Sequence, residues 1–228
     1  MTDKTTILTE KLKGFCAPFQ PQQTDIPCLP MYHYYSVNAA KYGSEATAVD
    51  WSIRHLIWDF KDGLDPNDGE KAPLYDKAFT EVTTSINNLV SKIFGQDKSC
   101  LTLACVPAST KFSYHNRYCN FYTAVCARTG MQSGYPFIHI AKEGIPKHSK
   151  DYTPGSEAEF AVTPNAFTNK DVLIFDDIIT KGETLRKFTK LLQADGANVI
   201  GAITLGDTVL SPNRSMEDQP WEILKLGL

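Results

Sequence analysis

Two adjacent carboxylates, Asp176 and Asp177, follow a run of apolar residues and precede a turn, residues 180–184, that carries hydroxyls and a glycine. Such a turn suits an anion, because backbone N–H groups converge where a loop enters a helix and a glycine lets the backbone approach closely. The two aspartates would repel that anion, so they must face sugar hydroxyls, a divalent cation or a developing positive charge. Phosphate, hydroxyls and cation together describe a sugar phosphate.

The residues on either side of this turn predict a buried strand followed by a helix. Residues 172–175 are apolar without polar alternation, which is typical of a strand covered on both faces in a parallel sheet. After the turn, apolar side chains recur at helical spacing, at Leu185, Phe188, Leu191 and Leu192. The turn is therefore expected at a helix N-terminus, where the helix dipole favours a phosphate.

A purely structural interpretation is also open, since any α/β protein can end a core strand in two aspartates and begin the next helix at a glycine. That interpretation accounts neither for both Thr180 and Thr184 nor for their spacing from the carboxylates.

Residues 172–184 resemble the 5-phosphoribosyl-1-pyrophosphate (PRPP) binding motif of type I phosphoribosyltransferases, with one departure at Lys181, where the family usually has Ser, Thr, Ala or Arg. Within that superfamily the chain looks most like the ComF-like branch. The similar features are Trp-Asp-Phe-Lys-Asp-Gly at 58–63, Val-Pro-Ala-Ser at 106–109, Arg117 with Phe121, and Gly196 with Ala197. The resemblance implies an α/β protein with the phosphoribosyltransferase type I fold, a mainly parallel twisted sheet flanked by helices with an N-terminal helical cap or hood.

The resemblance also implies a reaction in which a nitrogen acceptor displaces pyrophosphate from C1 of PRPP, with Mg²⁺ as cofactor. It gives catalytic roles to Asp176, Asp177, Lys150 and Arg117. The 5-phosphate would be bound by Thr180, Lys181, Gly182, Glu183 and Thr184. The leaving pyrophosphate would be bound by a second loop, Ala108, Ser109, Thr110 and Lys111. The metal would be held indirectly, through PRPP, near Asp176 and Asp177.

Some of these assignments have plainer alternatives. Residues 107–111 could be an ordinary strand-to-helix loop, and Arg117 could form a surface salt bridge. The long connection 141–171 could be an active-site lid, contributing Lys147, His148 and Lys150, or an unrecognised hairpin with a solvated charge cluster.

The acceptor is not identified by the sequence. Purine-salvage relatives place an Asp where this chain has Thr180, which argues against hypoxanthine or guanine as the substrate. Base recognition would then come from the cap and from the loop after Leu205. Aromatic side chains able to stack on a ring are Tyr34, Tyr35, Trp51 and Trp58, although aromatic residues more often belong to a core.

The chain is expected to contain a cap at 1–95 with two helices, a phosphoribosyltransferase core at 96–210 and a tail at 211–228. Helices are expected at residues 45–60, 73–94, 115–128 and 182–194. Strands are expected at 31–37, 101–106, 137–140, 172–175 and 199–205, with the remainder of 1–44 irregular and a possible edge strand at 221–226. The alternation of strands and helices from residue 101 onward predicts crossover units and a parallel sheet.

Composition sets the remaining expectations. A net charge of −3 does not suggest a dedicated nucleic-acid surface, and no stretch approaches the length of a membrane span. The first residues lack the apolar region of a secretory signal, so a cytoplasmic location is expected.

ComF-like proteins often carry an N-terminal zinc cluster, but only Cys16 and Cys28 fall there, so zinc is not expected. Homodimers are common for the fold.

The main rival to an enzyme is a non-catalytic module that senses PRPP or a nucleotide and acts through a partner, or that serves DNA uptake. A third possibility is an enzyme that cleaves nucleosides or hydrolyses the phosphoribosyl group.

Overall fold

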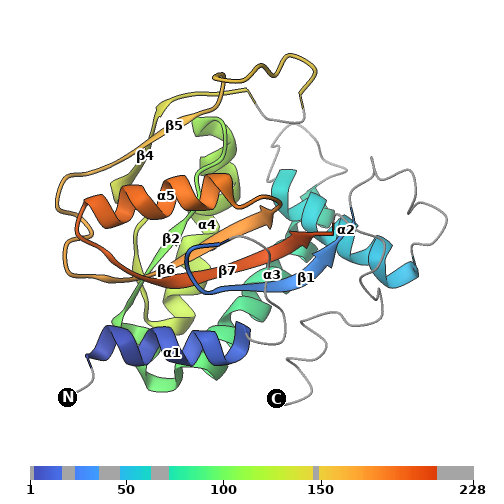
Figure 1. Ribbon diagram of the computed structural model, residues 1–228. Coiled ribbons are helices and arrows are strands. Elements are labelled where there is room, and N and C mark those ends of the chain that lie inside the picture. Colours follow the sequence, from blue (N-terminus) through green and yellow to red (C-terminus); the bar gives the residue numbers. More distant parts are fainter. Residues whose placement is uncertain (1–2, 17–23, 36–46, 63–71, 146–148, 210–228) are drawn as a thin grey trace.

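The computed structural model describes residues 3–16, 24–35, 47–62, 72–145 and 149–209, and its centre is a five-stranded sheet with the order β1-β7-β6-β2-β3 (Figure 1). The strands are β1 (Cys28–Tyr34), β7 (Asn198–Thr208), β6 (Asp171–Ile179), β2 (Leu101–Cys105) and β3 (Gln132–Ser133). All four neighbouring pairs are parallel, so the carboxyl ends of the strands lie along one edge of the sheet. The expected α/β class with a mainly parallel sheet flanked by helices is confirmed.

Helices cover both faces of this sheet. The helices α3 (Ala72–Phe94) and α4 (Lys111–Thr129) pack together on one face, and α1 (Lys4–Cys16) packs beside them against β1 and β7. The helix α5 (Glu183–Ala194) covers the opposite face (Figure 1). The helix α2 (Ala48–Asp62) lies at the end toward which β6, β7 and β1 point, and so it borders the carboxyl edge.

An aromatic cluster ties α2 and α4 to the central strand β6. Phe175 of β6 stacks on Phe121 of α4 with ring centroids 4.6 Å apart, and it meets Phe60 of α2 edge-on at 6.2 Å. All three rings are at most 1% exposed. Aromatic pairs of this kind contribute about 0.5–1.5 kcal/mol beyond the burial of their surface. The cluster therefore fixes the last turn of α2 and the middle of α4 next to residues 176 and 177.

The segment after α4 forms a hairpin outside the main sheet. Strand β4 (Ile138–Lys142) pairs antiparallel with β5 (Glu159–Val162) in a separate two-stranded sheet. The expectation that residues 137–140 join the parallel sheet is wrong, and the short β3 occupies the sheet edge instead. Strand patterns do not specify the pairing partner, and here Phe160 of β5 packs edge-on against Phe188 of α5. Residues 141–171 therefore contain one strand of a hairpin, while closure of this segment over the site as a lid stays a prediction.

The N-terminal part differs from the expected irregular chain. Helix α1 has a single buried row, Leu8, Leu12 and Cys16, which packs against the sheet instead of forming a broad apolar stripe. A narrow row of this kind is a weak sequence signal, because the tertiary contacts supply most of the stability of such a helix. The described part of the region expected as a cap with two helices thus contains three helices and the edge strand β1. The boundaries 1–95 and 96–210 stay predictions, and the tail at 211–228 lies outside the described residues.

The other elements lie close to their expected places. Helix α4 begins at Lys111 instead of 115, while β6 and β7 continue past the apolar run, to Ile179 and Thr208. Two short 3₁₀ helices, Gly95–Cys100 and Tyr135–Phe137, link neighbouring elements.

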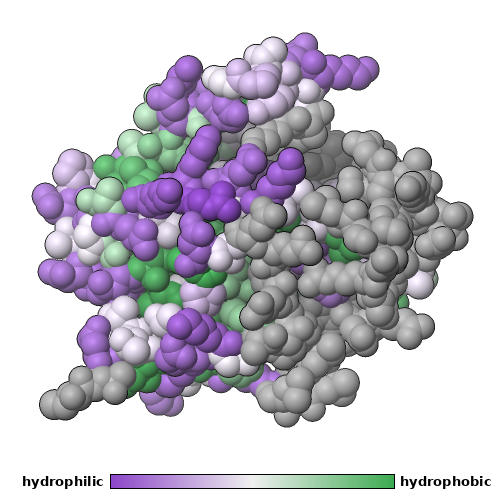
Figure 2. Space-filling model, viewed as in Figure 1, coloured by the Kyte–Doolittle hydropathy of each residue, from purple (hydrophilic) through white to green (hydrophobic). Residues whose placement is uncertain are grey.

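The solvent face of α5 is hydrophilic, and it forms the purple region in the middle of the view in Figure 2. The exposed positions of the helix include Glu183, Lys187 and Lys190. Among the helices that the structure describes, none combines the length and apolarity needed to cross a membrane.

Candidate functional site

The turn after β6 has the geometry expected for an anion-binding loop. Gly182 is the N-cap of α5 with φ of 67°, a left-handed conformation that favours glycine, and its carbonyl accepts the N–H of Arg186 at 2.8 Å. A glycine N-cap brings no side-chain oxygen to the first N–H groups of the helix, which suits a helix end that binds an external anion. Thr180, Lys181 and Glu183 are exposed around it.

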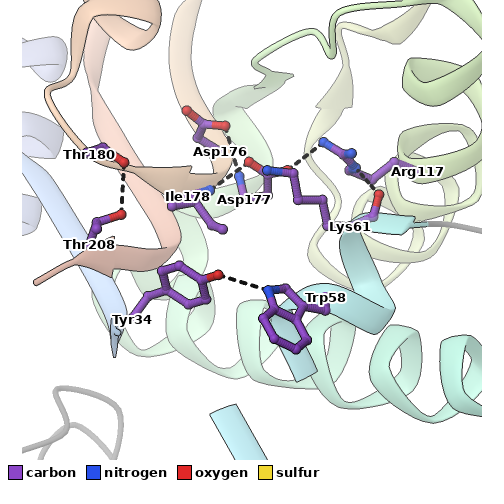
Figure 3. Close-up of polar contacts among 9 residues, drawn as sticks. All are labelled: Tyr34, Trp58, Lys61, Arg117, Asp176, Asp177, Ile178, Thr180 and Thr208. Atoms are coloured by element: carbon purple, nitrogen blue, oxygen red, sulfur yellow. Dashed lines mark hydrogen bonds and ion pairs between the residues drawn. The ribbon is translucent and has the colours of Figure 1, made fainter. Parts of the chain in front are cut away.

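Thr180 also links this turn to the neighbouring strand. Its hydroxyl lies 2.8 Å from the hydroxyl of Thr208, the last residue of β7 (Figure 3). A hydroxyl can donate one hydrogen bond and accept others, so this contact is compatible with the predicted phosphate binding by Thr180.

The two aspartates lie inside β6, not after it. Asp176 is paired with Thr204 of β7, and both carboxylates are buried, at 8% and 6% exposed for Asp176 and Asp177. Consecutive side chains of a strand point to opposite faces, so the two acids have different surroundings. Figure 3 shows the Asp176 carboxylate directed away from the side on which Asp177 meets its partners.

Asp177 is held by cations from two helices. Its Oδ2 lies 2.5 Å from Nη1 of Arg117 on α4 and 4.0 Å from Nζ of Lys61 on α2, while its Oδ1 accepts the N–H of Ile178 at 2.7 Å. Burial would raise the pKa of Asp177, but the charges of Arg117 and Lys61 and the backbone N–H outweigh it, and the pKa is lowered. Asp177 is therefore an ionised and fixed carboxylate.

Asp176 differs in both partner and charge state. Its Oδ1 accepts the N–H of Asp177 at 2.9 Å, and no described salt bridge reaches it. Burial, followed by the negative charge of Asp177, raises its pKa well above the ordinary value for an aspartate. Asp176 is the acid of the pair that would gain most from an incoming cation or from hydroxyl donors.

Arg117 is buried and bonded in two directions. Its Nη1 pairs with Asp177, and its Nε donates to the carbonyl oxygen of Lys61 at 2.8 Å (Figure 3). Only 8% of the residue is exposed. The alternative of a surface salt bridge is wrong, because the pair is internal and joins α4 to both β6 and α2.

The expected pyrophosphate loop starts beside the two acids of β6. Strands β2 and β6 are neighbours, β2 ends at Cys105 opposite Phe175, and the N–H of Val106 donates to the carbonyl of Phe175 at 2.8 Å. The loop after β2 therefore starts next to Asp176, before β6 itself ends at Ile179. Thr110 is the N-cap of α4, and its Oγ1 accepts the N–H of Ser113 at 3.1 Å. The geometry is compatible with the predicted role of Ala108, Ser109, Thr110 and Lys111.

One acidic side chain already contacts this loop. The carboxylate of Glu143, just after β4, accepts the N–H of Lys111 at 2.8 Å, and the N–H of Gly144 donates to the carbonyl of Ser109 at 2.9 Å. The hairpin is thus attached to the loop, and an anionic oxygen lies at the N-terminus of α4, a place that suits negative charge. Sequence reasoning gave Glu143 no role.

The predicted lid residues are only partly covered by the structure. Lys150 is exposed in the connection between β4 and β5 and makes no ion pair with the site in the described part of the chain. Lys147 and His148 lie outside the described residues.

The aromatic candidates divide between the site and its surroundings. Trp58 Nε1 donates to the hydroxyl of Tyr34 at 2.8 Å, which places both side chains beside the carboxyl edge (Figure 3). The guanidinium of Arg54 lies over the rings of Trp51 and Trp58, at 4.3 and 4.8 Å from their centroids. Tyr35 is buried. Tyr34 of β1 and Trp58 of α2 are thus the aromatic candidates that meet near the acids, and their role in base recognition stays a prediction.

Two described hollows lie away from the acids. A groove of about 710 Å³ between α2 and α3 is lined by residues including Ile53, Leu56 and Leu74, and a hollow of about 70 Å³ flanks α5 next to Gly182 and Arg186. Neither is lined by Asp176 or Asp177, so neither defines the candidate site.

Within the described residues no three His, Cys, Asp or Glu side chains come together as a metal cage. Burial raises the pKa of the Cys16 thiol to about 12 and raises that of Cys28 as well.

Comparison with known proteins finds partial likenesses to phosphoribosyltransferases. No family model matches the chain. A segment of 54 residues is 43% identical to hypoxanthine-guanine phosphoribosyltransferase from several strains of Staphylococcus aureus, which covers 24% of this chain and 28% of that protein. The chain therefore spans little more than a quarter of the length of these relatives.

Several solved structures align with parts of the chain at low identity and at TM-scores below 0.5. Leishmania donovani UMP synthase aligns with 79% of this chain and 35% of its own at 14% identity and a TM-score of 0.38. Mycobacterium smegmatis phosphoribosylpyrophosphate synthetase aligns with 57% and 34% at 17% identity and a TM-score of 0.36. Staphylococcus aureus hypoxanthine phosphoribosyltransferase aligns with 59% and 71% at 18% identity and a TM-score of 0.32.

Sequence reasoning located the acids and the turn but missed two contacting residues. Lys61 and Glu143 gave only weak signals: Lys61 lies within the Trp-Asp-Phe-Lys-Asp-Gly run, and Glu143 follows a predicted strand. Folding brings Lys61 to Asp177 and Glu143 to Lys111.

Proposed function

We propose that this protein is a Mg²⁺-dependent phosphoribosyltransferase of ComF-like type, which transfers the phosphoribosyl group of PRPP to a nitrogen acceptor and releases pyrophosphate. The observation that carries the proposal is the arrangement at the end of β6, where two buried acids precede a left-handed glycine at the N-terminus of α5. The partial identity to a phosphoribosyltransferase supports the same class.

Each part of PRPP has a matching part of the site. The 5-phosphate would be bound by the backbone of residues 180–184 and by the dipole of α5. The ribose hydroxyls would donate to Asp176 and Asp177. The pyrophosphate would lie toward residues 108–111, since their loop starts next to the acids of β6.

The reaction is a displacement at C1. The C1–O bond breaks with its electron pair on the departing pyrophosphate, the nitrogen lone pair forms the C1–N bond, and the nitrogen loses a proton to water. Positive charge develops on the sugar ring, and the ionised Asp177, with Asp176 beside it, would stabilise that charge. Arg117 keeps Asp177 fixed and ionised throughout.

The residues present fit a metal held largely by the substrate. Mg²⁺ retains water and substrate phosphate oxygens as ligands and needs only one or two carboxylates. Asp176 fits as the carboxylate nearest to such an ion because it lacks a described salt bridge. When bound, Mg²⁺ would supply positive charge to the pyrophosphate.

The acceptor is proposed to be neither hypoxanthine nor guanine, although the curated relatives carry those names. Thr180 replaces the Asp that purine-salvage enzymes use near the base, and its hydroxyl bonds to Thr208. The aromatic pair Tyr34 and Trp58 is the proposed side for acceptor binding.

A second candidate function is regulatory: the protein would bind PRPP or a nucleotide without turnover and act through a partner. An accessory role in DNA uptake belongs to the same alternative. The contact between Glu143 and the N–H of Lys111 favours it, because this carboxylate occupies a donor that a catalytic pyrophosphate loop would need. A cytoplasmic location and a homodimer belong to both proposals.

Calorimetric titration with PRPP, with and without Mg²⁺, tests the first step. Binding that strengthens with Mg²⁺ supports the proposal, while the absence of heat in both conditions removes it. Pyrophosphate release over a panel of nitrogen heterocycles then separates enzyme from regulator: binding without release with any acceptor supports the second function. Product analysis would reveal release of free ribose 5-phosphate, the mark of a hydrolase.

A further inference from the structure

Of the two described cations beside Asp177, Lys61 is the more accessible. Its ammonium lies 4.0 Å from Oδ2 of Asp177, a distance at which the pair attracts without a tight hydrogen bond, and 33% of its side chain is exposed. Arg117, the other cation beside Asp177, has a side chain only 10% exposed. The two cations therefore differ in what they can still bind.

Arg117 already forms two contacts within the protein. One nitrogen contacts Asp177, and Nε donates to the carbonyl oxygen of Lys61 at 2.8 Å. A substrate phosphate could reach the guanidinium only by breaking a buried pair, which would leave Asp177 uncompensated at high cost. Lys61 is thus better placed than Arg117 to contact the pyrophosphate.

The fold presents Lys61 in a fixed place. It belongs to the last turn of α2, where a cation is stabilised by the helix dipole. Phe60, the preceding residue, is anchored in the aromatic cluster with Phe121 and Phe175. Arg117 holds the Lys61 carbonyl. The backbone is therefore rigid, whereas the four-carbon stem of the side chain lets the ammonium move by several ångströms.

The charges around Asp177 leave the Lys61 ammonium able to bind a further anion. Asp177 already has a close counter-ion in Arg117, and the pKa of Asp176 is raised by burial and by Asp177. Lys61 is therefore a second positive charge next to one satisfied carboxylate. A bound pyrophosphate would bring several negative charges to the same edge of the sheet and would attract Lys61 more strongly than Asp177 does.

We propose that Lys61 binds the pyrophosphate moiety of PRPP and neutralises it as the C1–O bond breaks, with Arg117 acting as the positioning residue for both Lys61 and Asp177. This inference rests on the proposed function. It assigns a role to the Trp-Asp-Phe-Lys-Asp-Gly segment, whose lysine lies at the end of α2 and whose tryptophan bonds to Tyr34.

The test compares two ligands that differ only in the pyrophosphate. PRPP and ribose 5-phosphate are titrated by calorimetry into the full-length wild type, Lys61→Gln and Lys61→Arg, with Mg²⁺. We expect Lys61→Gln to weaken PRPP binding by about tenfold or more, as for loss of a charge-assisted hydrogen bond, with less than about a twofold change for ribose 5-phosphate. Lys61→Arg should restore most of the PRPP affinity because it keeps the charge.

Lys13→Gln serves as the matched control. Lys13 is 52% exposed on α1 and pairs with Glu10, so the variant removes the same charge at a distance from the acids. It should bind both ligands as the wild type does. An equal loss for PRPP and ribose 5-phosphate in Lys61→Gln would overturn the inference, since Lys61 would then act through Asp177 alone, and so would an unchanged PRPP affinity.

A measurement on the wild type keeps the inference testable if the Lys61 variants do not fold. Acylation of lysines by a dilute amine-reactive reagent, followed by peptide mapping, reports the accessibility of Lys61. PRPP should protect Lys61 and ribose 5-phosphate should not; equal protection by both, or by neither, contradicts the inference. A wild type that does not bind PRPP removes the proposed function and this inference together, whereas PRPP binding without protection of Lys61 removes the inference alone.

Discussion

The guanidinium of Arg117 contacts the carboxylate of Asp177 across 60 residues of sequence, and this pair joins α4 to the strand that carries both acids. Through its Nε, the same guanidinium holds the end of α2. One buried side chain therefore sets the relative positions of β6, α2 and α4 at the candidate site.

Loss of Arg117 should destabilise the fold as well as the site. Arg117→Ala leaves Asp177 buried without its close counter-ion, and breaking such a pair costs about 3–5 kcal/mol. Urea denaturation followed by circular dichroism measures the change in free energy of unfolding. Arg128→Ala, which removes an exposed arginine bonded to Thr84, is the control and should change stability by less than about 0.5 kcal/mol. Similar stabilities for the two variants would show that the pair contributes little.

The two aspartates should respond differently to neutralisation. Asp176→Asn replaces a buried carboxyl group whose pKa is raised. It should therefore leave the free energy of unfolding at neutral pH unchanged or higher. Asp177→Asn removes the partner of Arg117 and should be destabilising. Both variants should lose PRPP-dependent turnover. Equal destabilisation in thermal melts at pH 7 would contradict the distinction between them.

Asp176 should also give stability a specific pH dependence. Because its folded-state pKa is raised, the stability it contributes is present below the unfolded value of about 4 and is lost as pH rises through the folded value. Asp177, with a lowered pKa, acts in the opposite direction. Urea unfolding at several pH values above 4 should show that Asp176→Asn loses less stability with rising pH than the wild type. Parallel profiles would refute this.

Gly182→Ala should weaken PRPP binding beyond its effect on folding. An alanine at φ of 67° costs about 1–2 kcal/mol, and its methyl group would lie in the loop that faces the 5-phosphate. Gly95→Ala is a matched control, since Gly95 has φ of 57° and no atom within 4 Å of an added Cβ. Both variants should lose similar stability, but only Gly182→Ala should lose affinity in calorimetry. Wild-type affinity in Gly182→Ala would argue against this loop as the phosphate site.

Glu143→Gln should strengthen binding of inorganic pyrophosphate. The substitution removes a negative charge from the N–H of Lys111 while keeping the side-chain size. A gain of about two- to fivefold is expected for an exposed charge, and it should shrink at high salt. Glu159→Gln, at an exposed residue paired with Lys142, is the control and should have no effect. A weaker binding in Glu143→Gln would mean that the carboxylate organises the loop for its ligand.

The sequence alone determined the local unit that carries the chemistry. An apolar run without alternation, two acids, a glycine-bearing turn and a helical repeat predicted a buried strand, an anion-binding loop and a helix. The strand and the helix are observed as β6 and α5, joined by a turn with a left-handed Gly182, whereas anion binding by that turn stays a prediction. The parallel sheet also followed from the alternation of strands and helices. Such features depend on neighbours within about a dozen residues, so they can be predicted from pattern and backbone geometry.

Only the tertiary structure decided what surrounds that unit. The two adjacent acids were equivalent in sequence, yet the alternation of β6 and the approach of α2 and α4 give Asp177 two cations and leave Asp176 without a described salt bridge. Helix α1 and the contact between Glu143 and Lys111 likewise escaped prediction, and the β4–β5 hairpin was only one of two interpretations left open. The physical reason is that these features depend on long-range packing and on burial, which the local sequence does not encode at any one position.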